Sequence, residues 1–316
     1  MYGLTQEPPE LPERYFTLES YEAGVARWCP GCGDHGVLTA VQRICRDEQL
    51  PPEKVVAVSG IGCSSRFPHY MHTYGFHGLH GRALPVASGI KSRRPDLDVW
   101  VATGDGDCCS IGAGHWLHAV RYNMDMVVML FDNNIYGLTK KQTSPTSPAG
   151  LMTNTHPEGS WLPPLNVISN MLGFTNVSFV ARTVDWNPLH LYQTLKRGHE
   201  HRGLAFVQIL QRCPAFTADI FDNLMREPDR ILLLEHADGV AVDPAVAKIY
   251  NNHLEHDPTD LRTARQLAEH PEKIPIGLFF HNPQAPCYEE FTTQGLQMSV
   301  EEKLTGLDRE LDRFAI

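Results

Sequence analysis

The sequence lacks the features that carry a chain into a membrane or onto a nucleic acid. Its apolar runs are short: MVVMLF, residues 126–131, is among the longest, far below the roughly 20 residues that span a bilayer. Acidic residues outnumber basic ones by 37 to 27, and the formal net charge of −10 disfavours nucleic acid or an anionic membrane surface as the main partner. The opening MYGLTQEPPELPERYF has neither the basic end nor the apolar stretch of a secretory signal, so we expect a cytoplasmic location.

The sequence also shows no internal repeat and no low-complexity tract. The 316 residues, 42% of them hydrophobic, can fill the core of one large or two ordinary domains. Eight cysteines are present. In the cytoplasm these would be reduced thiols or metal ligands rather than disulfides.

Short apolar, β-branched runs alternate with helical patterns over the first two thirds of the chain. Runs that are apolar throughout are typical of strands buried on both faces, and strand–helix alternation predicts an α/β fold with a doubly wound, mainly parallel sheet. The predicted strands are residues 54–59, 98–103, 126–131, 176–180 and 204–210. The predicted helices are residues 36–50, 81–92, 111–123 and 187–202.

The pattern weakens after about residue 215. We therefore divide the chain into an α/β domain, residues 1–214, and a C-terminal extension, residues 215–316, packed on the core or on a partner subunit. Within the extension, DPTDLRTARQLAEHPEKIPIG and SVEEKLTGLDRELDRFAI are typical of surface helix and tail.

Two strand-end turns carry oxygen ligands. Gly104-Asp105-Gly106 follows one predicted strand, and Asp132-Asn133-Asn134 follows the next. Asp105 and Asn133 are 28 positions apart. Neighbouring parallel strands would bring both turns to one edge of the sheet, where ligands of such folds bind. A carboxylate and an amide oxygen there, with a backbone carbonyl, suit Mg²⁺ completed by phosphates, and the glycines let backbone N–H groups approach a diphosphate. The alternative is an ordinary strand–turn–helix, because GDG alone is a weak signal.

Four cysteines fall at the same predicted edge. Cys29 and Cys32 form CPGC, Cys63 lies in SGIGCSS, and Cys213 lies in QRCPAF. Four thiolates can hold zinc or a [4Fe–4S] cluster, and the spacing does not separate the two. The CxxC pair taken alone favours structural zinc. A diphosphate cofactor that forms carbanion-like intermediates changes this, because a redox centre beside it can accept electrons and zinc cannot. The cofactor motif therefore favours the [4Fe–4S] cluster.

The GDG and NN turns resemble the thiamine diphosphate motif, which implies Asp105, Asn133 and the carbonyl of Ile135 as the Mg²⁺ ligands. Over residues 20–215 the chain resembles the β subunit of 2-oxoacid:ferredoxin oxidoreductases, nearest the 2-oxoglutarate type. The resemblance rests on WCPGCGDHGV, SGIGCSSRFPHYMHTYGFHGLHGRALPVASGIK, the stretch from GDGDCCSIG to GLTKKQTSPTS, and QRCPAF.

This resemblance implies thiamine diphosphate, Mg²⁺ and one [4Fe–4S] cluster held by Cys29, Cys32, Cys63 and Cys213. It also implies an α-subunit partner in an (αβ)₂ assembly, ferredoxin, and a 2-oxoacid and coenzyme A as substrates. The expected reaction is oxidative decarboxylation of 2-oxoglutarate to succinyl-CoA and CO₂, or its reverse. The cofactor-binding candidates are Gly33, Asp34, Gly62, Ser64, His80, Gly104, Asp105, Gly106, Asp107, Asn133, Ile135, Tyr136, Gly137 and Leu138.

Substrate choice rests on weaker signals. His80 can touch the thiazolium or the substrate carboxylate, and a structural role is the alternative. Arg66, three residues past Cys63, can bind the distal carboxylate of 2-oxoglutarate. Lys140 and Lys141 compete for that role; they stand in GLTKKQ, where this class often has GLTGGQ. Pyruvate, branched-chain and aryl-pyruvate substrates stay open, as does a zinc-stabilised binding module without chemistry.

Overall fold

The computed structural model describes residues 14–293 and 298–314, and within them nine strands form a single sheet in the order β2-β1-β3-β4-β6-β5-β9-β7-β8. From β2 to β5 every neighbouring pair is parallel. β9 runs antiparallel to β5, and β7 runs parallel to both β9 and β8. The strands are β1 (Val55–Ser59), β2 (Tyr74–His77), β3 (Asp98–Gly104), β4 (Met126–Asp132), β5 (Phe179–Val184), β6 (Leu204–Leu210), β7 (Ile231–Glu235), β8 (His253–Glu255) and β9 (Ile274–His281).

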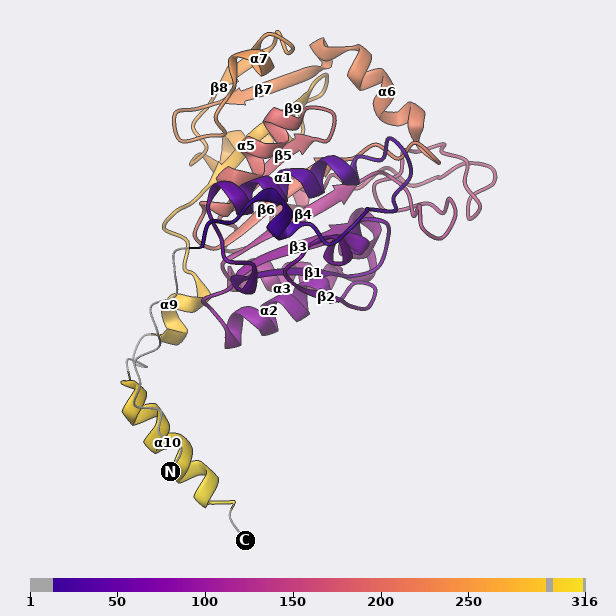
Figure 1. Cartoon of the computed structure of the whole chain (residues 1–316). Helices are drawn as coiled ribbons and strands as arrows, with labels where there is room; N and C mark the ends of the chain where they lie inside the picture. The colour runs from indigo at the N-terminus through magenta and orange to yellow at the C-terminus, as the bar shows by residue number, and fades with distance from the viewer. Residues whose placement is uncertain (1–13, 294–297, 315–316) are drawn as a thin grey trace.

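Helices cover both faces of this sheet (Figure 1). The α-helices are α1 (Asp34–Asp47), α2 (Ala83–Arg93), α3 (Ala113–Tyr122), α4 (Val167–Leu172), α5 (Pro188–His199), α6 (Ala218–Arg226), α7 (Pro244–Ala247), α8 (Leu261–Ala268), α9 (Tyr288–Thr293) and α10 (Val300–Asp312). The short helical turns are η1 (Leu18–Tyr21), η2 (Pro52–Lys54), η3 (Ser64–Tyr70), η4 (Asp107–Ile111) and η5 (Pro228–Arg230).

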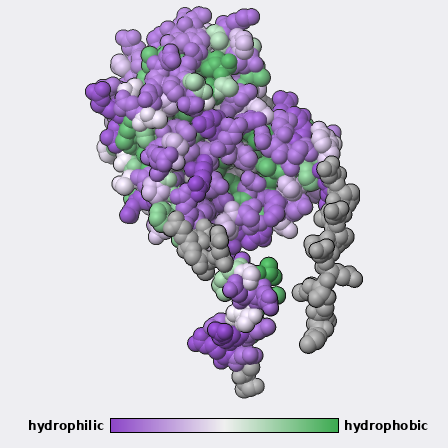
Figure 2. Space-filling view, turned by 90° about the vertical axis from the view of Figure 1, so that its left-hand side faces the viewer, coloured by the Kyte–Doolittle hydropathy of each residue, from purple (hydrophilic) through white to green (hydrophobic). Residues whose placement is uncertain are grey.

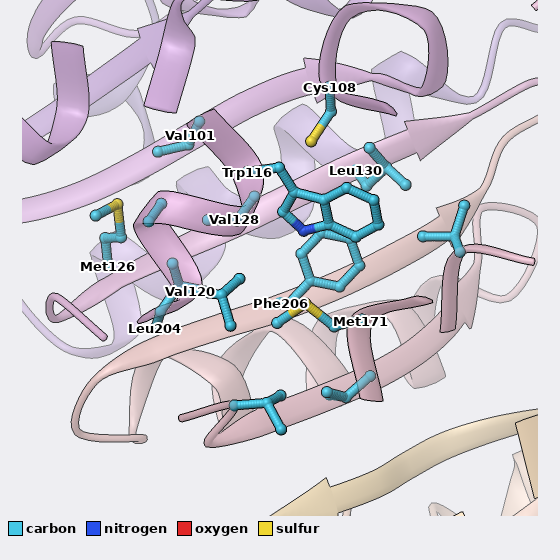
Figure 3. Packing of buried hydrophobic residues seen from close by; sticks show 14 of the residues in the cluster. Val101, Cys108, Trp116, Val120, Met126, Val128, Leu130, Met171, Leu204 and Phe206 are labelled. Carbon is cyan, nitrogen blue, oxygen red and sulfur yellow. The ribbon is translucent and has the colours of Figure 1, made fainter. Parts of the chain in front are cut away.

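Alternate residues of each central strand enter two different cores. In β3, Val99 and Val101 pack with α2, α3 and α4, whereas Trp100 and Ala102 pack with α1 and α5. Figure 3 shows the first of these cores, where the ring of Trp116 stacks on that of Phe206 with centroids 5.5 Å apart. Burial on both faces explains why these strands are apolar throughout, since each buried side chain contributes about 1.5–3 kcal/mol.

The predicted α/β class and parallel central sheet are confirmed. Four predicted strands match β1, β3, β4 and β6 within one residue. The strand predicted at 176–180 was placed too early, because β5 continues through Arg182 to Val184. Arg182 is buried and donates to Oε1 of Gln208 (2.8 Å) and to the carbonyl of Pro275 (3.3 Å). This charged residue hid the second half of the strand.

The region after residue 215 contributes three strands that the sequence did not predict. β7 and β9 pack in a smaller core with Phe221, Leu224 and Tyr250. The sheet therefore runs across the boundary predicted after residue 214. The division into two parts remains a prediction, and its first 13 residues lie outside the described part of the chain. α8 and α10 lie in the two segments expected to be surface helix and tail. Residues 274–277 of the first segment instead begin the buried strand β9.

Figure 2 shows a mainly hydrophilic surface with scattered apolar side chains. In the described part of the chain, none of the helices combines the length and apolar character needed to cross a bilayer.

Candidate functional site

A cavity of about 450 Å³ opens at the carboxyl ends of β1, β3 and β4. Its volume lies in the range of small-molecule and cofactor sites. The loops after these three strands line it, together with the turn that follows β2. Among the sequence candidates, the lining includes Gly62, Cys63, Ser64, His80, Gly104, Asp105, Gly106, Asp107, Asn133, Ile135, Tyr136, Gly137 and Leu138.

Asp105 and Asn133 meet in this lining, as their strand-end positions predict. Asp105 is 3% exposed, and burial, followed by the neighbouring carboxylate of Asp132, raises its pKa above the usual range. Oδ1 of Asn133 accepts a hydrogen bond from the backbone N–H of Ile135 at 3.2 Å, which folds the turn tightly. A carboxylate, an amide oxygen and the nearby carbonyls form the hard-oxygen donor set that Mg²⁺ prefers, so these residues fit that ion.

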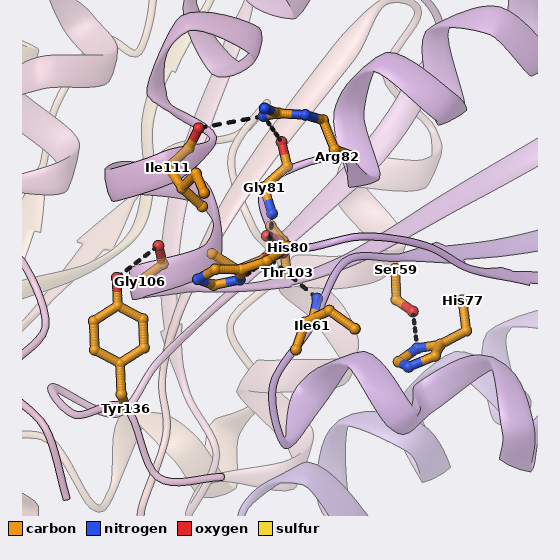
Figure 4. Close-up of polar contacts among 11 residues, drawn as sticks. Ser59, Ile61, His77, His80, Gly81, Arg82, Thr103, Gly106, Ile111 and Tyr136 are labelled. Carbon is orange, nitrogen blue, oxygen red and sulfur yellow. Dashed lines mark hydrogen bonds and ion pairs between the residues drawn. The ribbon is translucent and has the colours of Figure 1, made fainter. Parts of the chain in front are cut away.

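Tyr136 closes one side of the cavity against the GDG turn. Its hydroxyl donates to the carbonyl of Gly106 at 3.1 Å, as Figure 4 shows. A Cβ built on Gly106 would overlap the Tyr136 ring, so a side chain there would displace the tyrosine. Glycine at this turn is thus required by close packing.

The loop after β4 returns to the site through two hydroxyls that the sequence analysis missed. Ser144 and Thr146 both contact Oδ2 of Asp105, at 2.5 and 2.6 Å, and Thr146 also contacts Oδ1 of Asp132 at 2.8 Å. The sequence pattern of this loop, which is rich in Pro, Ser and Thr, does not show which hydroxyls turn inward. Other lining residues that the sequence did not single out are Ile61, Phe131, Thr139, Gln142, Thr143 and Thr155.

The four candidate cysteines lie on neighbouring segments beside the cavity. Sγ of Cys63 and of Cys213 both approach Gly137, at 3.7 and 3.8 Å from a Cβ built there. Burial is the main cause that raises the pKa of Cys63 to about 12, and the nearby Cys213 and Cys29 raise it further. The pKa of Cys32 is also raised, first by burial and in part by Cys63 and Cys213.

Within the described residues, however, no three or more Cys, His, Asp or Glu side chains form a ready metal-binding group. The thiols are near enough to influence one another electrostatically. All four are free, and their exposure ranges from exposed Cys29 to buried Cys213. Soft thiolates are the donors that iron–sulfur clusters use, so the donor chemistry fits a cluster, whose presence remains a proposal.

Gly33 and Asp34 do not line the cavity, unlike the other cofactor-binding candidates. Gly33 packs against Asp185, whose carboxylate would lie 2.5 Å from a Cβ on the glycine. Asp185 in turn forms an ion pair with Arg212 at 2.9 Å. Asp34 is fully buried, and burial raises its pKa to about 7. Both residues follow Cys32 directly in the chain, and their assignment to the cofactor remains a prediction.

Arg66 lies in an adjoining cavity of about 650 Å³ that shares Ile61, Gly62 and Leu138 with the first. Arg27, His69 and His77 also line this second cavity, so cationic and imidazole groups collect there. Lys140 and Lys141 line neither cavity. Both have left-handed backbones, φ 77° and 70°, a conformation that glycine adopts without strain.

Comparisons with known proteins agree with this geometry. Residues 60–209 match the family described as "Thiamine pyrophosphate enzyme, C-terminal TPP binding domain". Residues 245–295 match the family that represents the C-terminal part of the pyruvate ferredoxin oxidoreductase beta subunit. The two matches lie on either side of residue 214.

Similar whole chains include the 2-oxoacid:ferredoxin oxidoreductase subunit beta of Saccharolobus solfataricus, 37% identical over 83% of this chain and 84% of that one. The 2-oxoglutarate oxidoreductase subunit KorB of Mycobacterium tuberculosis is 46% identical over 68% of this chain, which spans 58% of that protein. Among solved structures, the 2-oxoglutarate:ferredoxin oxidoreductase from Magnetococcus marinus with 2-oxoglutarate, coenzyme A and succinyl-CoA bound is similar. It is 35% identical, with a TM-score of 0.79, over 92% of this chain and 96% of that one.

Proposed function

The chain belongs to the β subunits of the 2-oxoacid:ferredoxin oxidoreductases, and from this premise we propose that it works with an α subunit to decarboxylate 2-oxoglutarate oxidatively. The products are succinyl-CoA, CO₂ and reduced ferredoxin, or the reaction runs in reverse. The observation that carries this proposal is the meeting of Asp105 and Asn133 in one cavity within the thiamine-diphosphate-binding match. A zinc-stabilised binding module without chemistry does not fit this family.

Thiamine diphosphate and Mg²⁺ belong in this cavity. Asp105, Asn133 and the carbonyl of Ile135 would hold the ion, and the glycines at 104 and 106 leave room for the diphosphate. When bound, thiamine diphosphate supplies a thiazolium carbon that adds to the keto group of the substrate. Tyr136 and the loop after β4 form part of the cavity wall.

A [4Fe–4S] cluster would be held by Cys29, Cys32, Cys63 and Cys213. When bound, the cluster would supply a one-electron acceptor next to the cavity, suited to the reduction of ferredoxin. The sulfurs of Cys63 and Cys213 lie close to Gly137, a cavity residue, and this supports the position of the cluster. Gln211 donates to Sγ of Cys32 at 3.3 Å, the kind of hydrogen bond that tunes such sulfurs.

Two residues are assigned to the substrate. His80 presents its ring in the cavity wall, beside the position proposed for the thiazolium and the reacting carbon of the substrate. Arg66 lies in the adjoining cavity, where a guanidinium suits the distal carboxylate that distinguishes 2-oxoglutarate from pyruvate. Pyruvate, branched-chain and aryl-pyruvate acids form a second set of substrates, because the Saccharolobus relative is named for 2-oxoacids in general.

The remaining assignments concern assembly. We expect an (αβ)₂ enzyme in the cytoplasm, with coenzyme A and ferredoxin as its partners in turnover. The carboxylate that activates the aminopyrimidine of the cofactor would come from the α subunit, so the β chain alone would be inactive.

The test is anaerobic activity of the two-subunit complex on a panel of 2-oxoacids, with iron measured per β chain. Replacing any of the four cysteines with Ala is expected to remove the roughly four irons of a Cys₄ cluster and stop ferredoxin reduction. Cys45→Ala, at a buried thiol in α1, is the matched control and should keep both. Iron retained in Cys213→Ala removes that residue from the ligand set.

Substrate choice has its own variant. Arg66→Met should raise KM for 2-oxoglutarate and spare monocarboxylic 2-oxoacids, since losing one charge-assisted pair changes kcat/KM by roughly 30- to 1,000-fold. An equal loss on both substrate classes points instead to damage of the Cys63 loop.

A further inference from the structure

One buried carboxylate joins three of the loops around the cavity. Oδ1 of Asp107 accepts hydrogen bonds from the backbone N–H of Ile61 at 3.1 Å and of Gly81 at 2.7 Å. Oδ2 accepts from the hydroxyl of Thr103 at 2.7 Å. Figure 4 shows Ile61, Gly81 and Thr103 gathered around His80 at the end of β3.

The fourth partner of Asp107 is His80. Its Nδ1 lies 2.7 Å from Oδ1. A carboxylate only accepts hydrogen bonds, so Nδ1 must carry the proton in this contact. In a neutral imidazole the other nitrogen, Nε2, is then the acceptor, and the ring lies in the cavity wall with its centroid 5.9 Å from that of Tyr136.

Two glycines are required by this arrangement. A Cβ on Gly60 would overlap Oδ2 of Asp107, so a side chain at residue 60 would push the carboxylate away. Gly81 has φ +73°, and a Cβ there would lie 2.7 Å from the backbone nitrogen of Gly112. The backbone is thus shaped around the Asp107 carboxylate.

This geometry leaves little capacity for a direct contact with the cofactor. The Asp107 side chain is 1% exposed, and the four donors of the described residues already use both oxygens. A carboxylate has about four acceptor positions. Asp107 therefore differs from Asp105 two residues earlier, which is bonded through Oδ2 to hydroxyls and lies at the predicted metal position.

We propose that Asp107 is a positioning residue that holds His80 in the Nδ1–H tautomer, with Nε2 turned to the substrate, and locks the loops after β1 and β2 around it. The inference rests on the proposed function, since it assigns His80 to the 2-oxoacid. Nε2, whose lone pair accepts hydrogen bonds, then takes a proton from a hydroxyl, a thiol or a water at the reacting centre. The imidazolium formed in this way, stabilised by the Asp107 carboxylate, returns the proton to the same centre or to water.

The experiment is a double-mutant cycle on the assembled complex. Asp107→Asn keeps the size of the side chain but not its charge, and should lower kcat about 10- to 1,000-fold with thiamine diphosphate affinity within about threefold of wild type. In a His80→Gln background the same change should lower kcat by less than about threefold, because it acts through His80. Multiplying losses in the double variant would overturn the proposal, since they indicate a structural effect independent of His80.

Thr103→Val is the matched control. It removes the hydrogen bond to Oδ2 and leaves the contact of Oδ1 with His80, so it should lower thermal stability while kcat stays within about threefold. A loss of kcat equal to that of Asp107→Asn would show that general loosening of the carboxylate, and not the histidine, explains the effect.

A second readout does not depend on turnover. With ¹⁵N-labelled histidine, the resonances that disappear in His80→Gln identify this ring, and their shifts report which nitrogen carries the proton. The proposal is supported if the wild type shows the Nδ1–H form and Asp107→Asn shows a different form. The same tautomer in both proteins overturns it. If the wild-type complex turns over none of the 2-oxoacids, the proposed function fails, and the ring spectrum still decides the role of Asp107.

Discussion

The cavity at the ends of β1, β3 and β4 and the C-terminal strands bury different kinds of side chain. Around the cavity, Asp105, Asp107 and Asp132 are at most 3% exposed, and hydroxyls, backbone N–H groups and an imidazole surround them. Around β7 and β9 the core consists of aliphatic and aromatic side chains such as Leu233 and Phe221. Burying carboxylates is unfavourable unless each is paired, whereas burying apolar groups stabilises directly. The buried carboxylates at the cavity therefore lower the free energy of unfolding but form a binding site. The apolar core of the C-terminal strands raises the free energy of unfolding.

The largest effect that would test this contrast concerns Asp105. Asp105→Ala should weaken thiamine diphosphate binding in the presence of Mg²⁺ by about 100-fold or more, because it removes the charged ligand assigned to the ion. Thermal stability should hold or rise, since a buried carboxylate with a raised pKa is lost. Calorimetric titration of the complex and thermal unfolding measure the two quantities.

The control for this variant is Asp308→Ala on the exposed side of α10, which should change neither. Normal cofactor affinity in Asp105→Ala would show that the GDG turn is a structural element.

The opposite result is expected for the C-terminal core. Leu233 is fully buried in β7, and Leu233→Ala should destabilise the protein by about 2–5 kcal/mol through lost contacts and a cavity. Cofactor affinity of the molecules that stay folded should not change. Leu254→Ala in neighbouring β8, where the side chain is 37% exposed, should have much less effect on unfolding by denaturant. A loss of cofactor affinity in Leu233→Ala would mean that the two regions are coupled.

A pH effect sharpens the contrast on the α1–α5 face. His190 is 1% exposed, its Nδ1 lies 2.8 Å from Oγ1 of Thr183, and burial lowers its pKa to about 4 from 6.5. Below pH 6.5 His190 binds a proton in the unfolded chain, whereas in the folded chain it stays neutral until about pH 4. Stability is therefore full above pH 6.5 and falls as the pH drops, by about 2 kcal/mol between pH 7 and pH 5.

Unfolding by denaturant at pH 7 and pH 5, for wild type and for His190→Phe, measures this change in the free energy of unfolding. The variant should lose the roughly 2 kcal/mol that His190 contributes to the pH dependence. Identical slopes in the two proteins would show that the pKa of His190 is the same in the folded and the unfolded chain.

The smallest effect lies at the rim of the site. Lys141→Gly should stabilise the protein by about 1 kcal/mol, because glycine adopts the φ of 70° without the steric cost of a Cβ. Lys141→Ala removes the same charge but keeps the Cβ, so it should give no such gain. Equal midpoints of thermal unfolding for the two variants would indicate that the left-handed backbone is not strained.

The sequence predicted the elements whose local pattern matches their environment. Strands buried on both faces, such as β3 and β4, are apolar throughout, and the turns after them carry candidate site residues. β2 was missed because its four residues are all exposed. β9 was missed because Pro275 and Gly277 interrupt an apolar run, although both are accommodated beside β7.

Contacts between distant segments could not be read from the sequence in the same way. The bond from Ser144 to Asp105 joins residues 39 positions apart, and that from Ile61 to Asp107 joins residues 46 apart. No local periodicity reports such pairs. Gly33 and Asp34, which the family resemblance suggested as cofactor-binding residues, lie where the chain packs against Asp185 and Arg212.

The position of β6 between β4 and β5 also has a consequence for biosynthesis. Both pairing partners of β5, namely β6 and β9, come later in the chain. A chain growing on the ribosome therefore exposes the apolar Phe179–Val184 segment without a strand beside it until Leu204–Leu210 has left the exit tunnel. Cys213 follows three residues after β6, so the nascent chain can assemble the proposed set of four thiols only after this central strand has been inserted.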